Sequence, residues 1–438
     1  MHRLIRTSTS AVALLSCMAN PSIGAPATAL LRQCIANKLA RESFSGVVSV
    51  EERGQQPIVL PHGVQAGSNS APITSRTRFN LGSSSKMFTA IAVGQLVDAH
   101  RIGWDDPIGK YVVGLTAEAA GVTIRQLLTH SSGLGDFFRP ENMQAMLRAR
   151  TASDILPLIA ADKPSFAPGS RFAYSNSGFA LLGILIERVS GLTYGDYLQR
   201  HIFRPAGMSD SGLDPKPLRS LAVGMTAGGM TMRSPNAGNS GQQVIGPDHN
   251  PTPPGDEQPS NGGLVLIGPD GKIQRVDQNQ NASAEPALRV TPGAREGYGS
   301  PAGGLFSTAA DMSRFATAML ENQLVTAATA NAITTREIVA APATDTSPER
   351  DYGFGFGVGV YATHRWYGHN GGTLGANAEF AVFPDDGVTI TVLSNRDPPV
   401  ATTMFGFVRG LLFDPAPDGS HDGCTHEQPA SGANTNNR

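Results

Sequence analysis

The sequence is poor in charge and lacks long apolar runs. Of its 438 residues only 16% are charged, and the formal net charge is -2. No basic stripe interleaved with aromatic residues occurs, which argues against nucleic acid as a partner. No run approaches the roughly 20 apolar residues that a membrane-spanning helix needs. The hydrophobic share of 40% is ample for the core of one large domain or of two interleaved lobes.

Cysteine is also scarce, with three residues that form no metal-binding pattern. Neither a cysteine cluster nor a His-Glu-x-x-His motif occurs, so the sequence indicates no metal site, and no cofactor is implied. Cys34 and Cys424 lie near opposite ends of the chain. In an oxidising compartment they could form a disulfide that ties the C-terminal tail to the first helix, and the alternative is two unrelated thiols.

The N-terminus has the pattern of an export signal. Arg3 and Arg6 precede a short apolar segment, and Ala25 ends a cleavage-site pattern, so residues 1–25 are predicted to be a signal peptide. A competing interpretation is a bacterial lipoprotein signal with a lipid anchor at Cys17. We therefore expect an exported protein, periplasmic or secreted, without a transmembrane span.

Strand-like segments occur at both ends of the chain, with helical segments between them. The strand-like segments are residues 46–51, 58–60, 354–360, 378–383 and 388–394. The main helical segments are residues 28–42, 140–163, 179–189, 309–320 and 400–412. This order predicts an α/β (α+β) domain over residues 26–414, in which an antiparallel sheet built from both termini is flanked by helices and carries an inserted, mainly helical lobe.

Residues 227–297 differ in composition from the rest of the chain. Residues 233–263 are too rich in Gly, Pro and Asn for a packed element, whereas residues 264–267 and 273–276 suit a small hairpin. We expect an inserted loop with no second domain. It could overhang the cleft and limit substrate size, or be a surface excursion. Residues 415–438 are polar and are predicted to be a disordered tail.

The stretch from Phe79 to Ala90 carries the first chemical signal. Ser83 is predicted at the start of a buried apolar helix, where free N–H groups and a partial positive charge suit a developing oxyanion. Lys86 lies on the same helix face, and a desolvated amine there can accept the Ser83 hydroxyl proton. The alternative is that Ser83 only caps the helix and Lys86 is solvated.

Two more motifs follow, Tyr174-Ser175-Asn176 before an apolar helix and His369-Asn370-Gly371-Gly372 in a glycine-rich segment that ends a strand. Together with Ser83-x-x-Lys86 they resemble the penicillin-recognising serine hydrolases, on the branch of class C beta-lactamases, related esterases and D-stereospecific peptidases. The surrounding phrases that are similar to that family are Gln126–Leu134, Pro168-Gly169, Ala302–Leu305 and Gly368–Thr373. The resemblance covers roughly residues 30–415 outside the insertion and implies a beta-lactamase/transpeptidase-like fold.

The resemblance also implies a role for each motif residue. Ser83 would be the acylated nucleophile, and Lys86 would be either its proton acceptor or the charge that tunes it. Tyr174 would be a second base, because a nearby cation favours the phenolate. Asn176 would hold Lys86 and a substrate amide.

The third motif would complete the site. The N–H groups of Ser83 and Gly372 would form the oxyanion hole, and Gly371 would allow close approach of backbone and substrate. His369 departs from the Lys-Thr-Gly of many beta-lactamases. A histidine titrates near neutrality and is a weaker, conditional anchor for a substrate carboxylate, so we expect activity to vary around pH 6–7 through His369. His130, in a serine-rich turn, is either a structural hydrogen-bonder or a catalytic base.

The motifs and the resemblance predict an exported serine hydrolase that acts through an acyl-enzyme on ester, amide or peptide-like substrates, D-amino-acid derivatives included. One alternative is a true beta-lactamase or D-alanyl-D-alanine carboxypeptidase, because these enzymes share the acylation machinery. A second alternative is a penicillin-binding sensor that is acylated without turnover. A fold resemblance alone does not decide among them.

Overall fold

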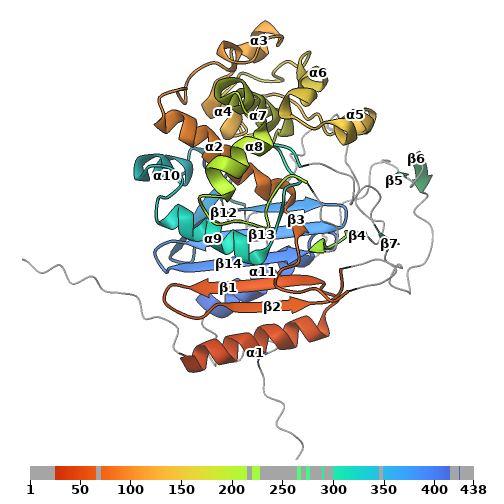
Figure 1. Cartoon of the computed structure of the whole chain (residues 1–438), viewed down its shortest axis with the longest axis vertical. Helices are drawn as coiled ribbons and strands as arrows, with labels where there is room; N and C mark the ends of the chain where they lie inside the picture. Colours follow the sequence, from red (N-terminus) through yellow and green to blue (C-terminus); the bar gives the residue numbers. More distant parts are fainter. Residues whose placement is uncertain are drawn as a thin grey trace, which may run out of the picture.

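The structure is a computed structural model that describes residues 25–65, 71–214, 220–226, 264–267, 273–276, 289–290, 299–344, 349–414 and 424. The predicted signal peptide, most of the predicted insertion and most of the predicted tail lie outside these residues. Figure 1 shows a central sheet with a group of helices at one end and α1 (Ala25–Arg41) at the other.

The central sheet has eight antiparallel strands in the order β2-β1-β14-β13-β12-β11-β10-β9. Their bounds are β1 (Gly46–Glu52), β2 (Ile58–His62), β9 (Ile338–Ala341), β10 (Arg350–Tyr352), β11 (Gly357–Tyr361), β12 (His364–Thr373), β13 (Ala376–Phe383) and β14 (Val388–Ser394). β1 pairs with β14 from Gly46↔Ser394 to Glu52↔Val388. The two ends of the chain thus meet in one sheet, which confirms the predicted fold class.

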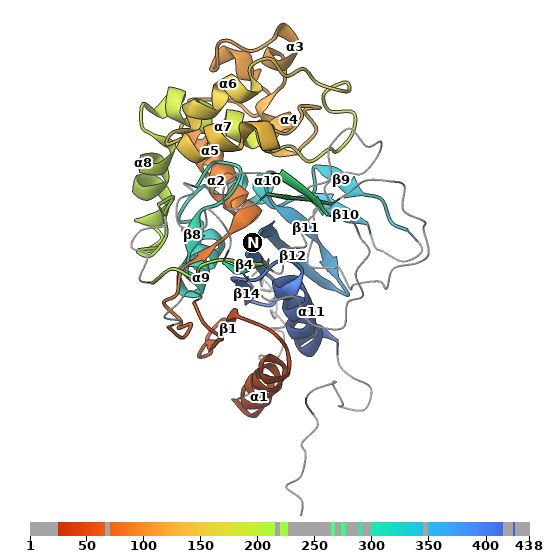
Figure 2. The same ribbon diagram turned by 90° about the vertical axis from the view of Figure 1, so that its right-hand side faces the viewer.

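Side-chain alternation explains why helices cover both faces of the sheet. On β13, Phe380 and Val382 join the core shared with the helical lobe, whereas Ala381 and Phe383 join the core beneath α1 and α11 (Val400–Phe413). Successive residues of a strand point to opposite faces, so an apolar residue at every position requires cover on both. In Figure 2, α1 and α11 lie at the end of the molecule opposite the helical lobe.

The helical lobe lies between the second and the eighth strand in sequence. Its helices are α2 (Lys86–Asp98), α3 (Ala117–Ala120), α4 (Ile124–Leu128), α5 (Met143–Arg148), α6 (Leu156–Ile159), α7 (Asn176–Ser190) and α8 (Tyr194–Leu198). Two more, α9 (Ala309–Leu320) and α10 (Ala327–Ile333), lead back to the sheet. Residues 140–163 are mostly helical, as predicted, but the segment is divided into short pieces. Thr151 adopts an extended conformation and starts a new capped turn with Asp154, which separates α5 from α6.

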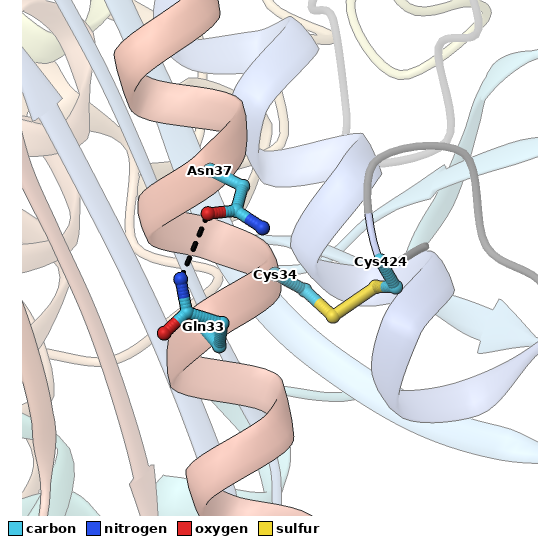
Figure 3. The surroundings of a disulfide bond; sticks show 4 residues. All are labelled: Gln33, Cys34, Asn37 and Cys424. Carbon is cyan, nitrogen blue, oxygen red and sulfur yellow. Dashed lines mark hydrogen bonds between the residues drawn. A yellow bond between two sulfur atoms is a disulfide. The ribbon is translucent and has the colours of Figure 1, made fainter. Parts of the chain in front are cut away.

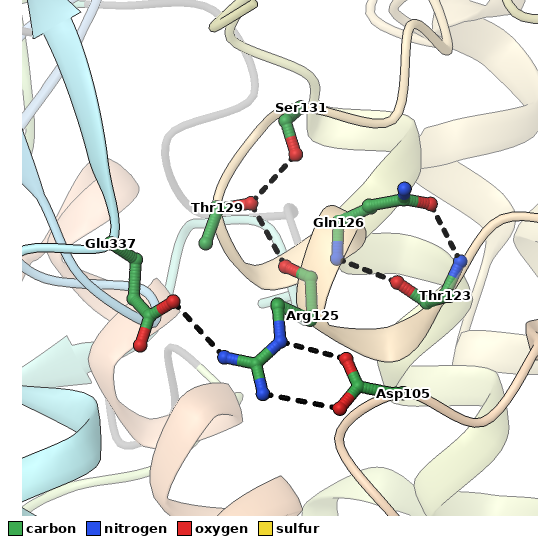
Figure 4. Close-up of polar contacts among 7 residues, drawn as sticks. All are labelled: Asp105, Thr123, Arg125, Gln126, Thr129, Ser131 and Glu337. Carbon is green, nitrogen blue, oxygen red and sulfur yellow. Dashed lines mark hydrogen bonds and ion pairs between the residues drawn. The ribbon is translucent and has the colours of Figure 1, made fainter. Parts of the chain in front are cut away.

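Arg125 on α4 joins the helical lobe to the edge of the sheet (Figure 4). Its guanidinium donates to both carboxylate oxygens of Asp105, at 2.8 and 3.2 Å, and to Glu337 Oε2 at 3.0 Å. Glu337 precedes β9, and its N–H donates to the Tyr352 carbonyl at 3.0 Å. The same helix begins with a capping box formed by Thr123 and Gln126. This ion-pair group therefore connects the two lobes near Tyr352.

The structure decides between the two alternatives for the cysteines. Cys34 on α1 and Cys424 form a disulfide, with their Cα atoms 4.8 Å apart (Figure 3). The bridge connects the first helix with a residue beyond α11.

The remaining strands form short antiparallel pairs. They are β3 (Phe79–Asn80) with β8 (Phe306–Ser307), β4 (Met225–Thr226) with β7 (Arg289–Val290), and β5 (Leu264–Ile267) with β6 (Ile273–Val276). The last pair confirms the predicted hairpin. Among the described residues, no helix has the length and hydrophobicity needed to cross a membrane.

Candidate active site

Three consecutive serines precede α2, and their surroundings differ. Ser84 and Ser85 are fully buried, and their hydroxyls donate to main-chain carbonyl oxygens at 2.9 and 2.7 Å. Ser83 is partly exposed, and its Oγ lies 3.3 Å from Nζ of Lys86. The fold therefore uses two of the hydroxyls as structural donors and leaves the third beside a buried amine.

Lys86 is the first residue of α2, and its side chain is fully buried. Besides the contact to Ser83, Nζ donates to Oδ1 of Asn176 at 2.7 Å and to the main-chain oxygen of Ala302 at 2.5 Å. Burial lowers the pKa of Lys86 to about 7, while the negative charge of Asp136 acts in the opposite direction. Near neutral pH a large share of Lys86 is therefore unprotonated and able to accept a proton.

The Tyr-Ser-Asn motif places all three of its side chains at the start of α7. Ser175 caps the helix, because its Oγ accepts from the Gly178 N–H at 3.1 Å and donates to the Gly135 carbonyl at 2.7 Å. Asn176 is the first helical residue and reaches Lys86, as the resemblance implies. The cap thus fixes the helix end that carries the Lys86 acceptor.

Tyr174 lies beside Lys86, but its surroundings do not favour the expected phenolate. The Lys86 Nζ is 4.7 Å from the centroid of the Tyr174 ring. Burial raises the pKa of Tyr174 far above its usual value; the Ser83 hydroxyl lowers that pKa, and the charge of Asp136 raises it further. Within the described residues, the Tyr174 hydroxyl lies close enough to Ser83 to feel this effect, but no contact of the hydroxyl has the geometry of a hydrogen bond. The geometry therefore favours a neutral phenol next to Ser83.

The glycines of the third motif pack closely against the turn that carries Ser83. β12 pairs with β11 only as far as Gly368, so the rest of this strand edge is left for that turn. A Cβ at Gly371 would lie 1.9 Å from the Leu81 carbonyl oxygen and 2.8 Å from the Ser83 nitrogen. A Cβ at Gly82 would lie 2.7 Å from the Gly372 nitrogen. Only glycine permits this approach, which brings the two backbone N–H groups expected for an oxyanion hole close together.

The third motif forms the C-terminal part of β12, which ends at Thr373, so it lies at the end of a strand as the sequence predicted. Glycine disfavours strand structure, but here the glycines allow the close contact between the strand and the turn. The sequence analysis also missed β9 and β10, and with β10 it missed Tyr352. These segments owe their strand structure to pairing within the sheet, which a short local pattern does not reveal.

His369 does not behave as the titrating anchor that the sequence predicts. Its side chain is 3% exposed, and its ring contacts the Asn370 carbonyl through Nδ1 and the Tyr352 hydroxyl through Nε2, at 2.5 and 2.9 Å. A carbonyl only accepts, so Nδ1 carries the proton and Nε2 accepts from the tyrosine. Burial lowers the pKa of His369 to about 3, and the charge of Lys86 lowers it further. His369 is therefore neutral at pH 6–7.

Of the two roles expected for His130, its surroundings favour the structural hydrogen-bonder over the catalytic base. It is fully buried, and its Nδ1 accepts from the Ser175 N–H at 3.0 Å. Its ring stacks on that of Tyr174, with centroids 4.1 Å apart. Burial lowers its pKa well below the usual value, and the charge of Lys86 lowers it further. His130 thus supports the backbone and ring of the tyrosine motif.

Asp136 belongs to the site, although the sequence analysis did not single it out. Its carboxylate accepts from Nδ2 of Asn176 at 2.8 Å. The contact links a turn after α4 with the start of α7, and no short motif includes both residues. No group of three or more His, Cys, Asp and Glu side chains in the described ranges could hold a metal ion.

Comparison with known proteins gives matches to a family and to individual relatives. The sequence profile of the family described as Beta-lactamase matches residues 31–410. The chain is 28% identical over 361 residues to penicillin-binding protein 4 of Amycolatopsis lactamdurans, and the match covers 79% of each protein. It is 32% identical over 177 residues to penicillin-binding protein 4* of Bacillus subtilis, covering 39% of this chain and 38% of that relative. A match to a beta-lactamase of Escherichia coli, 28% identical, covers 48% of this chain and 54% of the relative. The chain thus spans about half or less of the length of these last two relatives.

Solved structures show the same fold. The D-amino acid amidase of Ochrobactrum anthropi SV3 with D-phenylalanine has a TM-score of 0.65 and 20% identity, covering 90% of this chain and 100% of that one. A penicillin-binding protein of Bacillus halodurans has a TM-score of 0.63 and 24% identity, covering 85% of this chain and 97% of that one. The profile match over most of the chain, on a fold shared with these structures, shows that the protein belongs to the Beta-lactamase family of serine penicillin-recognising enzymes.

Proposed function

We propose that this member of the family is an exported serine hydrolase that works through an acyl-enzyme on Ser83. The observation that carries the proposal is the contact between a partly exposed serine hydroxyl and the fully buried amine of Lys86. Burial makes the amine a base near neutral pH, which is what activation of a serine requires. The candidate catalytic residues are Ser83, Lys86 and Tyr174.

The contacts of Lys86 suggest how acylation begins. A neutral amine has two hydrogens and one lone pair. The carbonyl oxygens of Asn176 and Ala302 accept the two hydrogens, which leaves the lone pair for the Ser83 hydroxyl. As Ser83 Oγ bonds to the substrate carbonyl carbon, its proton moves to Lys86. The oxyanion that forms would accept from the N–H groups of Ser83 and Gly372.

Breakdown of the tetrahedral intermediate needs the proton at the leaving group. Lys86 returns it through the Tyr174 hydroxyl, which acts as a neutral relay that accepts one proton and donates another. The bond from the carbonyl carbon to the leaving group breaks, and an ester to Ser83 remains. Water then attacks this ester with the same groups, which releases the acid and restores the Ser83 hydroxyl.

The substrates proposed are esters, amides or peptide-like molecules, D-amino-acid derivatives included. His369 is neutral and supplies no permanent cation for a substrate carboxylate, which favours these classes over penicillins. The amidase named above is one relative in fold with such a substrate class. The alternatives are a true beta-lactamase or D-alanyl-D-alanine carboxypeptidase, and a penicillin-binding sensor that is not turned over.

Intact mass and turnover test the proposal together. The protein is mixed briefly with p-nitrophenyl acetate, and separately with a penicillin, and wild type is compared with Ser83→Ala. The exposed Ser170→Ala serves as a control for loss of a serine hydroxyl. We expect an acetyl adduct and ester turnover in wild type and the control, neither in Ser83→Ala, and peptide mapping that places the adduct on Ser83.

The penicillin arm separates the alternatives. A long-lived penicillin adduct without turnover would favour the sensor, and rapid penicillin hydrolysis would favour the beta-lactamase. Adduct and turnover that persist in Ser83→Ala would overturn the acyl-enzyme proposal.

Export is part of the same proposal, and the disulfide between Cys34 and Cys424 supports it, because such bonds persist in oxidising compartments. The N-terminal residue of the mature protein distinguishes the two forms of export, by a cleaved signal peptide or as a lipoprotein. A chain that starts at Pro26 means signal-peptide cleavage, whereas a lipid-modified N-terminal Cys17 means a lipoprotein. An uncleaved chain recovered from the cytoplasm would contradict export.

A further inference from the structure

A partly buried carboxylate, that of Asp136, lies behind Asn176, on the side away from Lys86. Oδ2 of Asp136 accepts from Nδ2 of Asn176, and Oδ1 accepts from the Phe138 N–H, both at 2.8 Å. The Asp136 main-chain oxygen accepts from Nε of Arg139 at 2.7 Å. The adjacent Gly135 carbonyl accepts from the Ser175 hydroxyl. The carboxylate is therefore held by its own loop and by the start of α7.

The two neighbours of Asn176 dictate how its amide is turned. A lysine amine presents N–H donors to it, so the atom that faces Lys86 has to be the amide oxygen. An ionised carboxylate only accepts, so the atom that faces Asp136 has to be the amide nitrogen. Without the carboxylate, the amide would lose the contact that ties its NH2 group away from Lys86. The turned amide would present donors to an amine that needs an acceptor.

We propose that Asp136 is a positioning residue for the candidate acyl-transfer centre, where its carboxylate fixes the Asn176 amide and its negative charge sets how readily Lys86 gives up a proton. This inference rests on the proposed function of Ser83 and Lys86. Asp136 would thus control both the orientation of the Asn176 amide and the proton affinity of Lys86.

The other charged and titratable groups around Lys86 do not replace this carboxylate. Tyr174, His130 and His369 face the amine from the start of α7, the turn after α4 and β12, and each is neutral near pH 7. Burial raises the pKa of the Asp136 carboxyl, while hydrogen bonds from Phe138 and Asn176 and the charges of Lys86 and Arg139 act in the opposite direction. Arg139 also pairs with Asp162 at 3.5 Å. Asp136 is therefore the negative charge that raises the pKa of Lys86.

Two substitutions separate orientation from charge. Asp136→Asn keeps an oxygen that can accept from the Asn176 amide but removes the charge. We expect the acid limb of kcat/KM, which follows Lys86 in the free enzyme, to move by about one unit to lower pH. Asp136→Ala removes the acceptor as well, and we expect kcat to fall by about 10²-fold because the amine loses its fixed acceptor. Glu118→Gln removes an equal charge from an exposed pair with Lys163 and should not move the profile.

The measurements use p-nitrophenyl acetate turnover that has first been shown to require Ser83, with thermal unfolding of each variant to confirm folding. If Ser83→Ala hydrolyses p-nitrophenyl acetate like wild type, the proposed function is wrong, and the inference about Asp136 is wrong with it. If turnover requires Ser83 but both Asp136 variants keep the wild-type pH profile and kcat, Asp136 is not a positioning residue. A change in KM confined to cationic substrates would likewise overturn the inference, because it would make Asp136 a substrate contact.

Discussion

Lys86 and His369 are buried in the same part of the molecule, yet burial affects their chemistry in opposite ways. Burial lowers the pKa of both cations, because removal from water disfavours the charged form. The lysine starts at 10.5 and falls to about 7, which makes it a usable base. The histidine starts at 6.5 and falls to about 3, which keeps it neutral at any physiological pH. Burial thus makes Lys86 a base near neutral pH and keeps His369 from titrating there.

Their hydrogen bonds strengthen this difference. Lys86 is bonded to two acceptors, the oxygens of Asn176 and Ala302, and the carboxylate of Asp136 lies behind Asn176. His369 has one acceptor and one hydroxyl, and this arrangement satisfies both nitrogens of the neutral ring. A proton added to His369 would have to displace the Tyr352 donor. A proton added to Lys86 only turns the partly exposed Ser83 hydroxyl, whose oxygen can then accept from Nζ.

The largest effect is expected when the lysine amine is removed. Lys86→Met keeps the length of the apolar stem and deletes the proton acceptor, so Ser83-dependent kcat/KM for p-nitrophenyl acetate should fall by about 10³-fold. The acid limb near pH 7 should disappear with it. Lys110→Met, which removes a half-exposed lysine paired with Asp106, should keep both rate and profile. A Lys86→Met enzyme with more than a tenth of wild-type activity would show that another group is the base.

A smaller loss is expected at Tyr174. A neutral relay shortens the proton path to the leaving group but is not the primary base, so Tyr174→Phe should lower kcat by about 10²-fold and leave the acid limb near pH 7. The pH dependence of kcat/KM for wild type and variant provides the measurement. If the limb near pH 7 disappears in Tyr174→Phe, the tyrosine is the titrating base, and the assignment of roles to Lys86 and Tyr174 has to be reversed.

The sequence predicted the two-ended sheet because β1, β2, β13 and β14 are rich in valine, isoleucine and other apolar residues and are bounded by turns. It also predicted the residues of the candidate site, since Ser83, Lys86, Tyr174 and Asn176 belong to short motifs that lie at helix starts. Their electrostatic behaviour was not predictable, because it depends on burial by distant elements. This is why the phenolate expected at Tyr174 and the neutral-pH titration expected at His369 do not follow.

Asp136 shows a second limit of the sequence. Its contact with Asn176 spans a separation of 40 residues and becomes visible only when the loop packs on α7. The break between α5 and α6, by contrast, has a local cause at Thr151 and Asp154 that the sequence does contain. A prediction that weighed capping boxes within helical segments would have found it.

The histidine side of the comparison can be tested through stability. In the unfolded chain His369 binds a proton at its ordinary pKa of 6.5, whereas in the folded protein the pKa is about 3. Because the pKa is lower in the folded protein, the contribution of neutral His369 to the free energy of unfolding is fully present above pH 6.5. It is lost as pH falls toward 3, by about 1.4 kcal/mol per pH unit. At pH 5 this amounts to about 2 kcal/mol.

His369→Gln removes the titration and keeps an oxygen that can accept from Tyr352. Denaturant unfolding at pH 8 and pH 5 should show a smaller loss of stability for the variant than for wild type, while the acid limb of activity near pH 7 stays in place. His130 also has a depressed pKa and is unchanged in the variant, so its contribution cancels in the comparison. An activity limb that moves with His369→Gln would restore the expectation that the sequence suggested.

The smallest effect concerns the ion-pair group that supports Tyr352, the partner of His369. Arg125→Met keeps an apolar stem near the Phe354 ring but loses Asp105 and Glu337, and we expect a loss of about 1 kcal/mol in the free energy of unfolding, because the pairs are partly exposed. Arg365→Met is the matched control, since Arg365 makes a similar two-pronged contact with Asp385 within the sheet alone. If Arg125 joins the two lobes, its loss should exceed that of the control, and high salt should narrow the difference. Equal losses would mean that Arg125 is an ordinary surface pair and that the position of Tyr352 depends on the strand pairing of β10 alone.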